Sequence, residues 1–197
     1  MTSKSGIMKS MIDEQFKIDF QLKNGESVLI RPLRAEDAES MQVGFKTLSQ
    51  ATIINRFLTP KKQLSENELA YYTHFDAHDH FALGAGIEGG SADKTKGIAI
   101  ARWMRRDDAP QQADFALLIQ DAYQGQGLGT CLMRLLIQGA QEQGLDSLHG
   151  TCLAYNLAMQ GVLKRLGPVH FTPLGDGELD ILLDLKDFET EPIIPAK

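Results

Sequence analysis

The chain contains 197 residues, of which 43% are hydrophobic, and this fits one globular domain with a sizeable core and leaves no room for a second domain. Its formal net charge of -6 argues against non-specific binding to nucleic acid and favours a cationic partner. No segment approaches the ~18 consecutive apolar residues of a membrane span, and residues 1–16 carry no apolar run of signal-peptide length, so we expect a cytoplasmic protein.

The first part of the chain predicts little regular structure before a single domain begins. Residues 1–17 are polar without a steady hydrophobic period, and we expect a flexible N-terminal segment. We expect residues 18–186 to form the single domain, and residues 187–197, with their acids and two prolines, to form a C-terminal tail. Residues 27–33 predict the strand that opens the sheet, and Pro32 confines it to an edge or to the end of the strand.

Two helices are predicted before the next strands. In residues 36–48 the apolar side chains recur in helical register, and acids occupy the first turn. Ser65 and Glu68 form the pattern of a capping box, which predicts the start of a second, short helix. Residues 50–63 lie between these helices and are rich in polar and basic side chains, so we expect a loop of the kind that commonly carries specificity.

Three strands are predicted next. Residues 81–87 and 96–104 have strand character and are joined by a hairpin loop that contains glycines. A turn at residues 105–110 leads to a buried strand at residues 114–119. The carboxylate of Asp114 lies on this otherwise apolar strand, so it must be paired, hydrated or functional, because an unpaired buried charge costs several kcal/mol.

A glycine-rich loop follows this strand and runs into a regular amphipathic helix. Gly125, Gly127 and Gly129 alternate with other residues, so the backbone can adopt positive φ and approach a ligand without Cβ atoms in the way. Apolar residues then recur at helical spacing and place the helix start near Gly127: Leu128, Cys131, Leu132, Leu135, Leu136 and Ala140. The first N–H groups of such a helix lack partners and its dipole favours negative charge, so we expect a diphosphate to bind here.

Two familiar phosphate sites with this layout do not match. A dinucleotide fingerprint needs the spacing Gly-x-Gly-x-x-Gly and an acidic residue at the end of the next strand, whereas the next strand here ends at Leu153 and Ala154. A triphosphate loop needs Gly-Lys-Ser/Thr, and Gly129, Thr130 and Cys131 lack the lysine.

The later elements complete a strand–helix–strand unit and a closing pair of strands. The glycine-loop helix is expected to end near Gln143, with Gly144 as its stop. We then expect a strand parallel to the first buried strand, a helix and two closing strands, at residues 148–153, 157–166, 169–173 and 178–185. Both cysteines lie in predicted core elements, and we expect small buried hydrophobic residues rather than a disulfide or a metal pair.

Gln124, Gly127 and Gly129 form a Gln-x-x-Gly-x-Gly segment directly after a strand with a lone carboxylate, and this resembles the acyl-CoA-binding signature of the GNAT superfamily of N-acetyltransferases. Asn156, one strand later, fits the same family. The resemblance extends over residues 28–185. Within this superfamily the chain is similar in particular to the acetyltransferase domain of bacterial Pat-type protein-lysine acetyltransferases. The segments that carry this likeness are residues 31–37, 55–58, 97–102 and 150–159.

This resemblance implies a mixed α/β GNAT fold, in which a central, twisted, mostly antiparallel sheet contains one splayed parallel pair of strands and carries helices on both faces. It implies an acyltransferase that moves the acetyl group of acetyl-CoA to a primary amine by direct attack in a ternary complex, without a metal. A protein lysine is the first expected acceptor and a polyamine or an amino acid the second, with part of the acceptor site in residues 50–63. The oligomeric state, including a homodimer, stays open.

The resemblance assigns the general base to Asp114, at a position where the family carries glutamate in an Ala-Glu pair. The aspartate is one methylene shorter, which reduces its reach by about 1.5 Å and favours a proton relay through water over direct contact. The alternative is an ion pair between Asp114 and Arg102 or Arg105, which would leave catalysis to positioning alone.

The resemblance also implies a set of cofactor contacts. The pyrophosphate of acetyl-CoA is expected on the loop and the first helical turn: Gln124, Gly125, Gln126, Gly127, Leu128, Gly129 and Thr130. The pantetheine arm is expected to bond to strand backbone, at Leu117, Leu118 and Ile119. Asn156 is expected near the amides of that arm, and equally as the N-cap of a helix.

Two departures from the family pattern matter. Many members carry a tyrosine as general acid seven residues after the asparagine, where this chain has Leu163, and strand parity turns Tyr155 elsewhere. The thiolate would then leave without a protein acid, or water would serve. Together with Asp114 in place of glutamate, this supports a rival interpretation, a non-catalytic acyl-CoA-binding sensor.

The histidines and aspartates at residues 74–80 match no metal-ligand spacing, and we expect a polar loop there.

Overall fold

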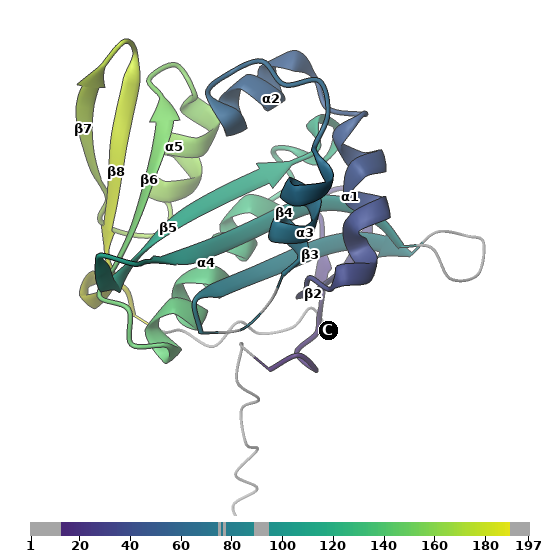
Figure 1. The fold of residues 1–197 in the computed structure, drawn as a ribbon, viewed down its shortest axis with the longest axis horizontal. Helices are drawn as coiled ribbons and strands as arrows, with labels where there is room; N and C mark the ends of the chain where they lie inside the picture. Colours follow the sequence, from purple (N-terminus) through teal and green to yellow (C-terminus); the bar gives the residue numbers. More distant parts are fainter. Residues whose placement is uncertain (1–12, 75, 77, 89–94, 190–197) are drawn as a thin grey trace, which may run out of the picture.

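The computed structural model describes residues 13–74, 76, 78–88 and 95–189. Within these residues, eight strands form a single sheet with the order β1-β2-β3-β4-β5-β6-β8-β7 (Figure 1). All neighbouring strands are antiparallel except β5 and β6, which are parallel, as the sequence predicted. The strands are β1 (Ile18–Gln21), β2 (Ser27–Pro32), β3 (His80–Glu88), β4 (Thr95–Arg106), β5 (Ala109–Ile119), β6 (Ser147–Leu153), β7 (His170–Gly175) and β8 (Glu178–Asp184).

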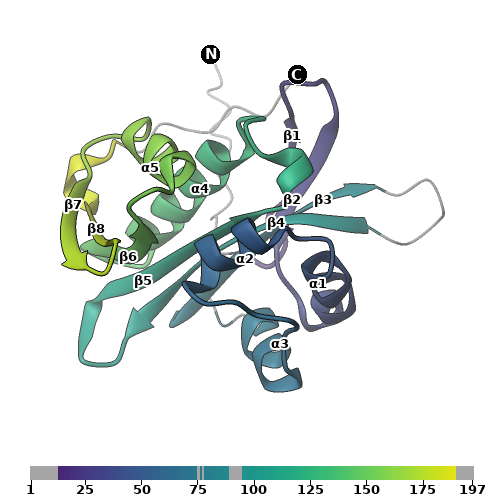
Figure 2. The same ribbon diagram turned by 90° about the horizontal axis from the view of Figure 1, so that it is seen from above.

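Helices cover both faces of the sheet (Figure 2). One face carries α1 (Ala38–Phe45), α2 (Gln50–Phe57) and α3 (Glu66–Thr73), and the other carries α4 (Leu128–Glu142) and α5 (Leu157–Lys164). The capping box predicted for α3 is present, because the Ser65 hydroxyl accepts the Glu68 N–H and the Glu68 carboxylate accepts the Ser65 N–H. No helix among the described residues is long and apolar enough to cross a bilayer.

The main core lies between α4 and the sheet. The apolar face of α4 follows the predicted spacing, and four of its leucines are fully buried: Leu128, Leu132, Leu135 and Leu136. They share one cluster with Phe81 and Trp103, and each buried leucine contributes about 1.5–3 kcal/mol of hydrophobic stabilisation. Gly139 permits the close approach of α4, since a Cβ atom there would lie 3.0 Å from the Phe81 ring.

A smaller cluster lies on the opposite face, between the sheet and the first three helices. Its buried members are Phe45, Leu48, Ile53 and Leu64. Leu118 of β5 packs against this cluster, whereas Phe115 and Leu117 of the same strand belong to the main core. Alternate residues of β5 therefore serve both cores, as expected for a strand in the middle of a sheet.

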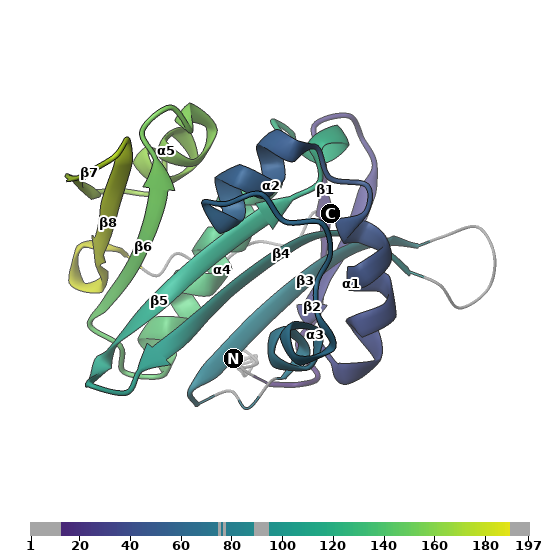
Figure 3. The same cartoon turned by 45° about the horizontal axis from the view of Figure 1, so that its top comes forward.

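β5 and β6 pair over only three residues and then separate (Figure 3). The last aligned pair is Asp114 with His149, and no residue of 115–119 pairs with β6. The ring of Phe115 lies where the strands part, since a Cβ atom at Gly150 would be 2.8 Å from it. The two strands therefore form the splayed parallel pair that the resemblance implied, with Asp114 at the last position where they pair.

α2 corrects the prediction of a loop over residues 50–63. The Ser49 hydroxyl caps this helix by accepting the Thr52 N–H at 3.1 Å, and the helix ends at Leu58, whose φ is 59°. The Asp121 carboxylate accepts hydrogen bonds from both Ser49 and Thr52, although Ser49 lies 72 positions earlier in the sequence. A partner so distant leaves no local pattern, which explains why the sequence predicted a loop.

Three other expectations need correction. β1 precedes the strand that was expected to open the sheet. Phe16 and Phe188, in segments expected to lie outside the domain, are buried in the main core, and a single aromatic side chain produces no detectable period. The turn expected over residues 105–110 is confined to the two residues between β4 and β5. Residues 89–94, which include most of the predicted hairpin loop, lie outside the described residues.

Candidate active site

The glycine loop has the backbone geometry of an anion site. Gly125 and Gly127 have φ values of 73° and 91°, in the left-handed region that favours glycine. Gly127 is the N-cap of α4, has no side-chain cap, and its carbonyl accepts the Cys131 N–H at 3.2 Å. The N–H groups of the first helical turn therefore have no partner within the helix and face the loop, where the helix dipole also attracts negative charge.

Gly129 serves a different purpose from the other two glycines. Its φ is not positive, but a Cβ atom there would lie 3.1 Å from Ile119 Cδ1 and 3.2 Å from Val162 Cγ2. The glycine thus lets α4 begin close against β5 and α5. Close packing at this point brings the first turn of α4 to the open edge of β5.

A network of side chains holds the glycine loop against α2. Gln124 Nε2 donates to Thr52 Oγ1 at 3.1 Å and to the Ile119 carbonyl at 3.0 Å. Asp121 accepts from the Ser49 N–H at 2.9 Å and from the Ser49 and Thr52 hydroxyls at 2.5 and 2.8 Å. Partial burial raises the pKa of the Asp121 carboxyl, but these hydrogen bonds together outweigh it and leave that pKa below its ordinary value. Sequence reasoning missed this network, because Ser49 precedes, and Thr52 lies within, the segment of residues 50–63 that was predicted to be a loop.

Gln126 meets the hairpin between β1 and β2. Its carbonyl accepts the Lys23 N–H at 3.3 Å. A Cβ atom at Gly127 would lie 3.7 Å from the Phe20 ring and 4.0 Å from Lys23 Cε, so the lysine stem runs beside the loop. Lys23 therefore places a cation beside the glycine loop, and only the tertiary structure reveals it, because β1 was not predicted.

The open edge of β5 presents backbone groups to the cleft. Gln120 N–H donates to the Ile98 carbonyl of β4 at 2.8 Å, and hydrogen-bonding direction alternates along a strand. By that alternation the backbone groups of Leu118 face β4, whereas those of Leu117 and Ile119 face away from β4, where the Ile119 carbonyl already accepts from Gln124 Nε2. The Leu118 side chain instead lines a pocket on the opposite face of the sheet. Of the three residues expected to hold an extended arm, two thus offer their backbone to it.

Asp114 is paired, but with neither of the arginines that the sequence suggested. Arg106 Nη2 and Nε donate to Asp114 Oδ1 at 2.6 and 3.0 Å, and the Asp114 side chain is 53% exposed. The alternative pairing with Arg102 or Arg105 is therefore wrong, because β4 continues as a strand to Arg106 and carries its guanidinium across to β5. Among the described residues, no hydrogen bond uses Asp114 Oδ2, so one oxygen remains available to a substrate or to water.

His149 is a second polar group at the closed end of the cleft. It aligns with Asp114 across the parallel pair, and its Nε2 lies 3.0 Å from Ser147 Oγ. Burial, and secondarily the Arg106 charge, lower the pKa of the imidazole, so it is neutral near pH 7. The sequence analysis did not single it out, although the expected parallel register of this strand was the signal that could have done so.

The predicted asparagine lies between β6 and α5. Asn156 is the N-cap of α5: its Oδ1 accepts the Met159 N–H at 3.1 Å, and the residue is 9% exposed. Leu163, where many family members carry a tyrosine, is fully buried, and the Tyr155 side chain is 68% exposed. The described part of this region thus offers a helix cap and no phenol directed into the cleft.

Two other candidate groups have structural roles. Cys131 and Cys152 are free and buried, as expected, and burial raises the pKa of the Cys131 thiol to about 12, so it is no nucleophile near neutral pH. Asp76 Oδ1 accepts the backbone N–H groups of the following loop, at 2.9, 2.7 and 2.9 Å. The described residues contain no group of three or more His, Cys, Asp or Glu side chains that could hold a metal ion.

Comparison with known proteins identifies relatives of this chain. The family described as "Acetyltransferase (GNAT) domain" matches residues 27–169. Acetyltransferase Pat of Mycolicibacterium smegmatis is 32% identical over 152 residues, which are 77% of this chain and 44% of that protein. Acetyltransferase PA5475 of Pseudomonas aeruginosa is 34% identical over 146 residues, which are 74% of this chain and 77% of that protein.

A solved structure supports the same fold. The crystal structure of the GNAT domain of S. lividans PAT matches with a TM-score of 0.76 and 27% sequence identity, over 85% of this chain and 96% of that chain. The chain spans less than half of the M. smegmatis protein, so that comparison concerns the shared region. The family, the likeness to Pat-type proteins and the fold inferred from the sequence are confirmed.

Proposed function

Because the chain belongs to the GNAT acetyltransferase family, we propose that it transfers the acetyl group of acetyl-CoA to a primary amine, by direct attack within a ternary complex. The observation that carries this proposal is the layout of β5: the strand leads into the glycine loop at the N-terminus of α4, and its splayed edge runs back from that loop to Asp114. The loop suits a diphosphate and the edge suits an extended arm. Together they match the two parts of coenzyme A.

The residues of this layout divide the work of binding. Backbone N–H groups of residues 125–130 would hold the pyrophosphate, with the Lys23 ammonium as a counter-charge. Leu117 and Ile119 would bond to the pantetheine amides in the manner of a neighbouring strand. Bound acetyl-CoA supplies an activated acetyl thioester. The same strand edge offers N–H groups to a developing oxyanion, which is usually the largest single electrostatic contribution to such catalysis.

Asp114 is the base that we propose. Arg106 engages Oδ1 and thereby fixes the orientation of the carboxylate, while Oδ2 can take a proton from the attacking amine or from an intervening water. The half-exposed side chain leaves room for that water. His149, neutral and aligned with Asp114, can accept the proton next. The thiolate then leaves without a protein acid, since a thiol pKa of about 8.5 makes it a competent leaving group.

For the acceptor we propose a protein lysine first and a small amine, such as a polyamine or an amino acid, second. The likeness to Pat-type proteins and the formal net charge of -6 support a cationic acceptor. A non-catalytic acyl-CoA sensor is the second candidate function. It is favoured by the ion pair between Asp114 and Arg106 and by the buried Leu163.

Thiol release from acetyl-CoA, measured with lysine peptides, polyamines and amino acids, tests the proposal. We expect release that depends on one class of acceptor and falls 10²-fold or more in Asp114→Asn, the usual scale for a general base. Asp108→Asn, an exposed carboxylate in the neighbouring turn, is the matched control and keeps the wild-type rate. Absence of release from every acceptor, with acetyl-CoA still raising the melting temperature, would favour the sensor. Loss of that shift as well would contradict the cofactor assignment.

A further inference from the structure

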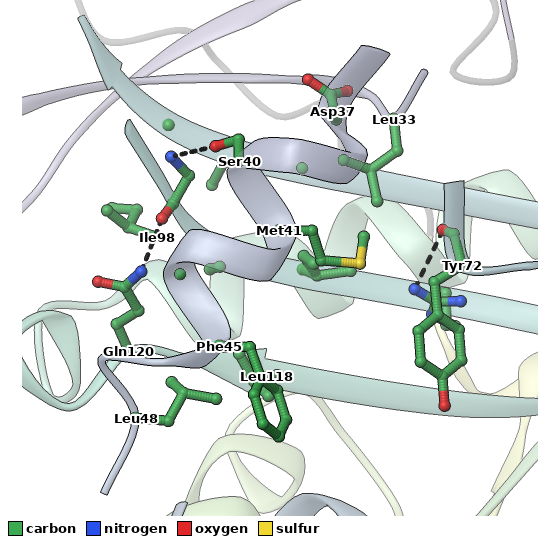
Figure 4. A pocket seen from close by; sticks show the side chains of 18 of the residues that line it. Leu33, Asp37, Ser40, Met41, Phe45, Leu48, Tyr72, Ile98, Leu118 and Gln120 are labelled. Carbon is green, nitrogen blue, oxygen red and sulfur yellow. Dashed lines mark hydrogen bonds between the residues drawn. The ribbon is translucent and has the colours of Figure 1, made fainter. Parts of the chain in front are cut away.

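A pocket lies under the first three helices, on the sheet face opposite α4. Its volume is about 100 Å³, enough for a few water molecules or a small organic ligand. Figure 4 shows Met41 between Tyr72, at one end of the pocket, and Gln120, at the other. The space exists because α1 crosses strand positions that carry no side chain: Gly84, Gly86 and Gly97.

Arg102 of β4 brings a charge into this mostly apolar pocket. The residue is 5% exposed, and its guanidinium lies 4.2 Å from the centre of the Tyr72 ring. Nη2 donates to the Tyr72 carbonyl at 3.2 Å, but the buried Nη1 has no hydrogen-bond partner. Burial, and secondarily the charge of Arg56, lower the pKa of this guanidinium to about 9, so it is still charged at neutral pH. A buried cation in this state is destabilising unless an anion joins it.

Arg56 of α2 lines the same pocket and adds a second positive charge. Its guanidinium lies 4.9 Å from the centre of the Phe57 ring. Among the described residues, no carboxylate forms an ion pair with Arg56 or Arg102. Arg31 lines this pocket too, but it is bidentate to Asp37 at 2.7 and 2.8 Å. The chain thus neutralises one arginine of the pocket with its own carboxylate and leaves two without one.

We propose that Arg56 and Arg102 bind the carboxylate of a small apolar organic acid, whose hydrocarbon part lies against Met41, Phe45 and Leu118. A carboxylate matches the planar fork of an arginine and fills the unused Nη1 position. The apolar walls favour a hydrocarbon tail over a second charged group, which is the reason for choosing a monocarboxylate over a phosphate. The lining of this pocket contains no residue of the glycine loop at residues 124–130.

The proposal concerns binding and does not depend on acetyl transfer. Ala116 lines the pocket and follows Asp114 by two residues on the same face of β5, which is about 7 Å along the strand. The two sites are therefore neighbours with separate residues. The carboxylate is titrated once with coenzyme A in excess, which keeps the glycine loop occupied if coenzyme A binds there. A parallel titration without coenzyme A keeps the test valid if coenzyme A does not bind.

Isothermal titration calorimetry with butanoate and hexanoate tests the site, with butanamide and hexanamide as uncharged counterparts. We expect hexanoate to bind more tightly than butanoate, and each amide to bind at least tenfold more weakly than its acid. Arg102→Met and Arg56→Met should each weaken hexanoate at least tenfold. Arg134→Met, an exposed arginine on α4, is the matched control and should leave binding unchanged.

Three outcomes would overturn the proposal. Equal affinity for acid and amide would leave only an apolar cavity, and wild-type affinity in both Met variants would locate the acid elsewhere. If inorganic phosphate displaced hexanoate at a concentration below that of hexanoate itself, the site would be one for phosphate and not for a carboxylate. Circular dichroism checks that each variant is folded. If Arg102→Met does not fold, Arg102→Lys, which keeps the charge but not the fork, should still bind hexanoate, more weakly than wild type.

Discussion

Individual residues around the cleft have sharply different tasks, and their geometry separates them. Asp114 keeps one carboxylate oxygen on Arg106 and the other without a bond to any described residue. Gly125 and Gly127 are glycines because their φ values are positive, whereas Gly129 is a glycine because two side chains occupy the space of a Cβ atom. Asn156 caps a helix. Substitutions at these positions should therefore fail in different ways.

Gly127→Ala should weaken binding of acetyl-CoA at least tenfold. Alanine at φ 91° is strained by about 1–2 kcal/mol, so the loop shifts away from the geometry that directs its N–H groups to the pyrophosphate. Gly175→Ala is the matched control, because Gly175 has φ 96° as the last residue of β7, far from the loop in sequence. Calorimetry should show unchanged affinity for Gly175→Ala. An equal loss in both variants would mean that the effect comes from general destabilisation.

The helices and strands differ in how well the sequence predicts them. α4 was predicted almost to its ends, because its apolar face is regular and glycines mark its start and its stop. β5 and β6 were predicted as a parallel pair with the family's layout, and the cleft between them followed. α2 was missed, since its N-terminus depends on Asp121, and Arg106 was assigned to a loop because the extension of β4 has no hydrophobic alternation. Local periodicity therefore predicted the strand and the helix on either side of the glycine loop, and missed the residues that reach them through tertiary contacts.

Ser49→Ala should weaken acetyl-CoA binding several-fold in addition to destabilising the protein. The change removes the cap of α2 and the hydroxyl that Asp121 holds, at a cost of about 1 kcal/mol, and it loosens the anchor of the glycine loop. Ser65→Ala removes the cap of α3, which does not touch that loop, and should cost similar stability with unchanged affinity. Urea unfolding and calorimetry measure the two effects separately. Unchanged affinity in Ser49→Ala would show that the loop keeps its geometry without α2.

At the scale of the whole molecule, the sheet divides into a larger and a smaller part. Strands β1 to β5 form one part and β6, β8 and β7 the other, and only the three-residue pairing of β5 with β6 joins them within the sheet. The main core under α4 includes residues of both parts and compensates for this short seam. The architecture thus lets β5 and β6 separate beyond Asp114 while one hydrophobic core holds both parts together.

Global stability should fall as the pH drops from about 6.5 to 4, in part because of His80. Burial, and secondarily Arg102, lower the pKa of this histidine to about 4 from 6.5 in the unfolded chain. Between these pH values the unfolded chain therefore binds a proton at His80 and the folded protein does not. The contribution of His80 to the free energy of unfolding is fully present above pH 6.5 and is lost as the pH falls through 4. The expected loss is on the order of 1–3 kcal/mol.

Chemical denaturation at pH 7, 5.5 and 4.5 checks this contribution. His80→Phe retains an aromatic ring beside Tyr71, whose ring centre lies 5.7 Å away, and should lose less stability on acidification than the wild type. His170→Phe changes an exposed histidine and should follow the wild-type dependence. An identical pH dependence in all three proteins would contradict the role of His80.

α2 contacts two sites: Arg56 lines the pocket under α1, while Thr52, one helical turn earlier, bonds to Gln124 of the glycine loop and to Asp121 just before it. Any ligand that moves this helix must alter the affinity for whatever the loop holds, and the reverse effect must be equal in size. Heterotropic coupling of this kind needs no second domain. One helix that contacts both sites is enough to couple the affinity at one site to the occupancy of the other.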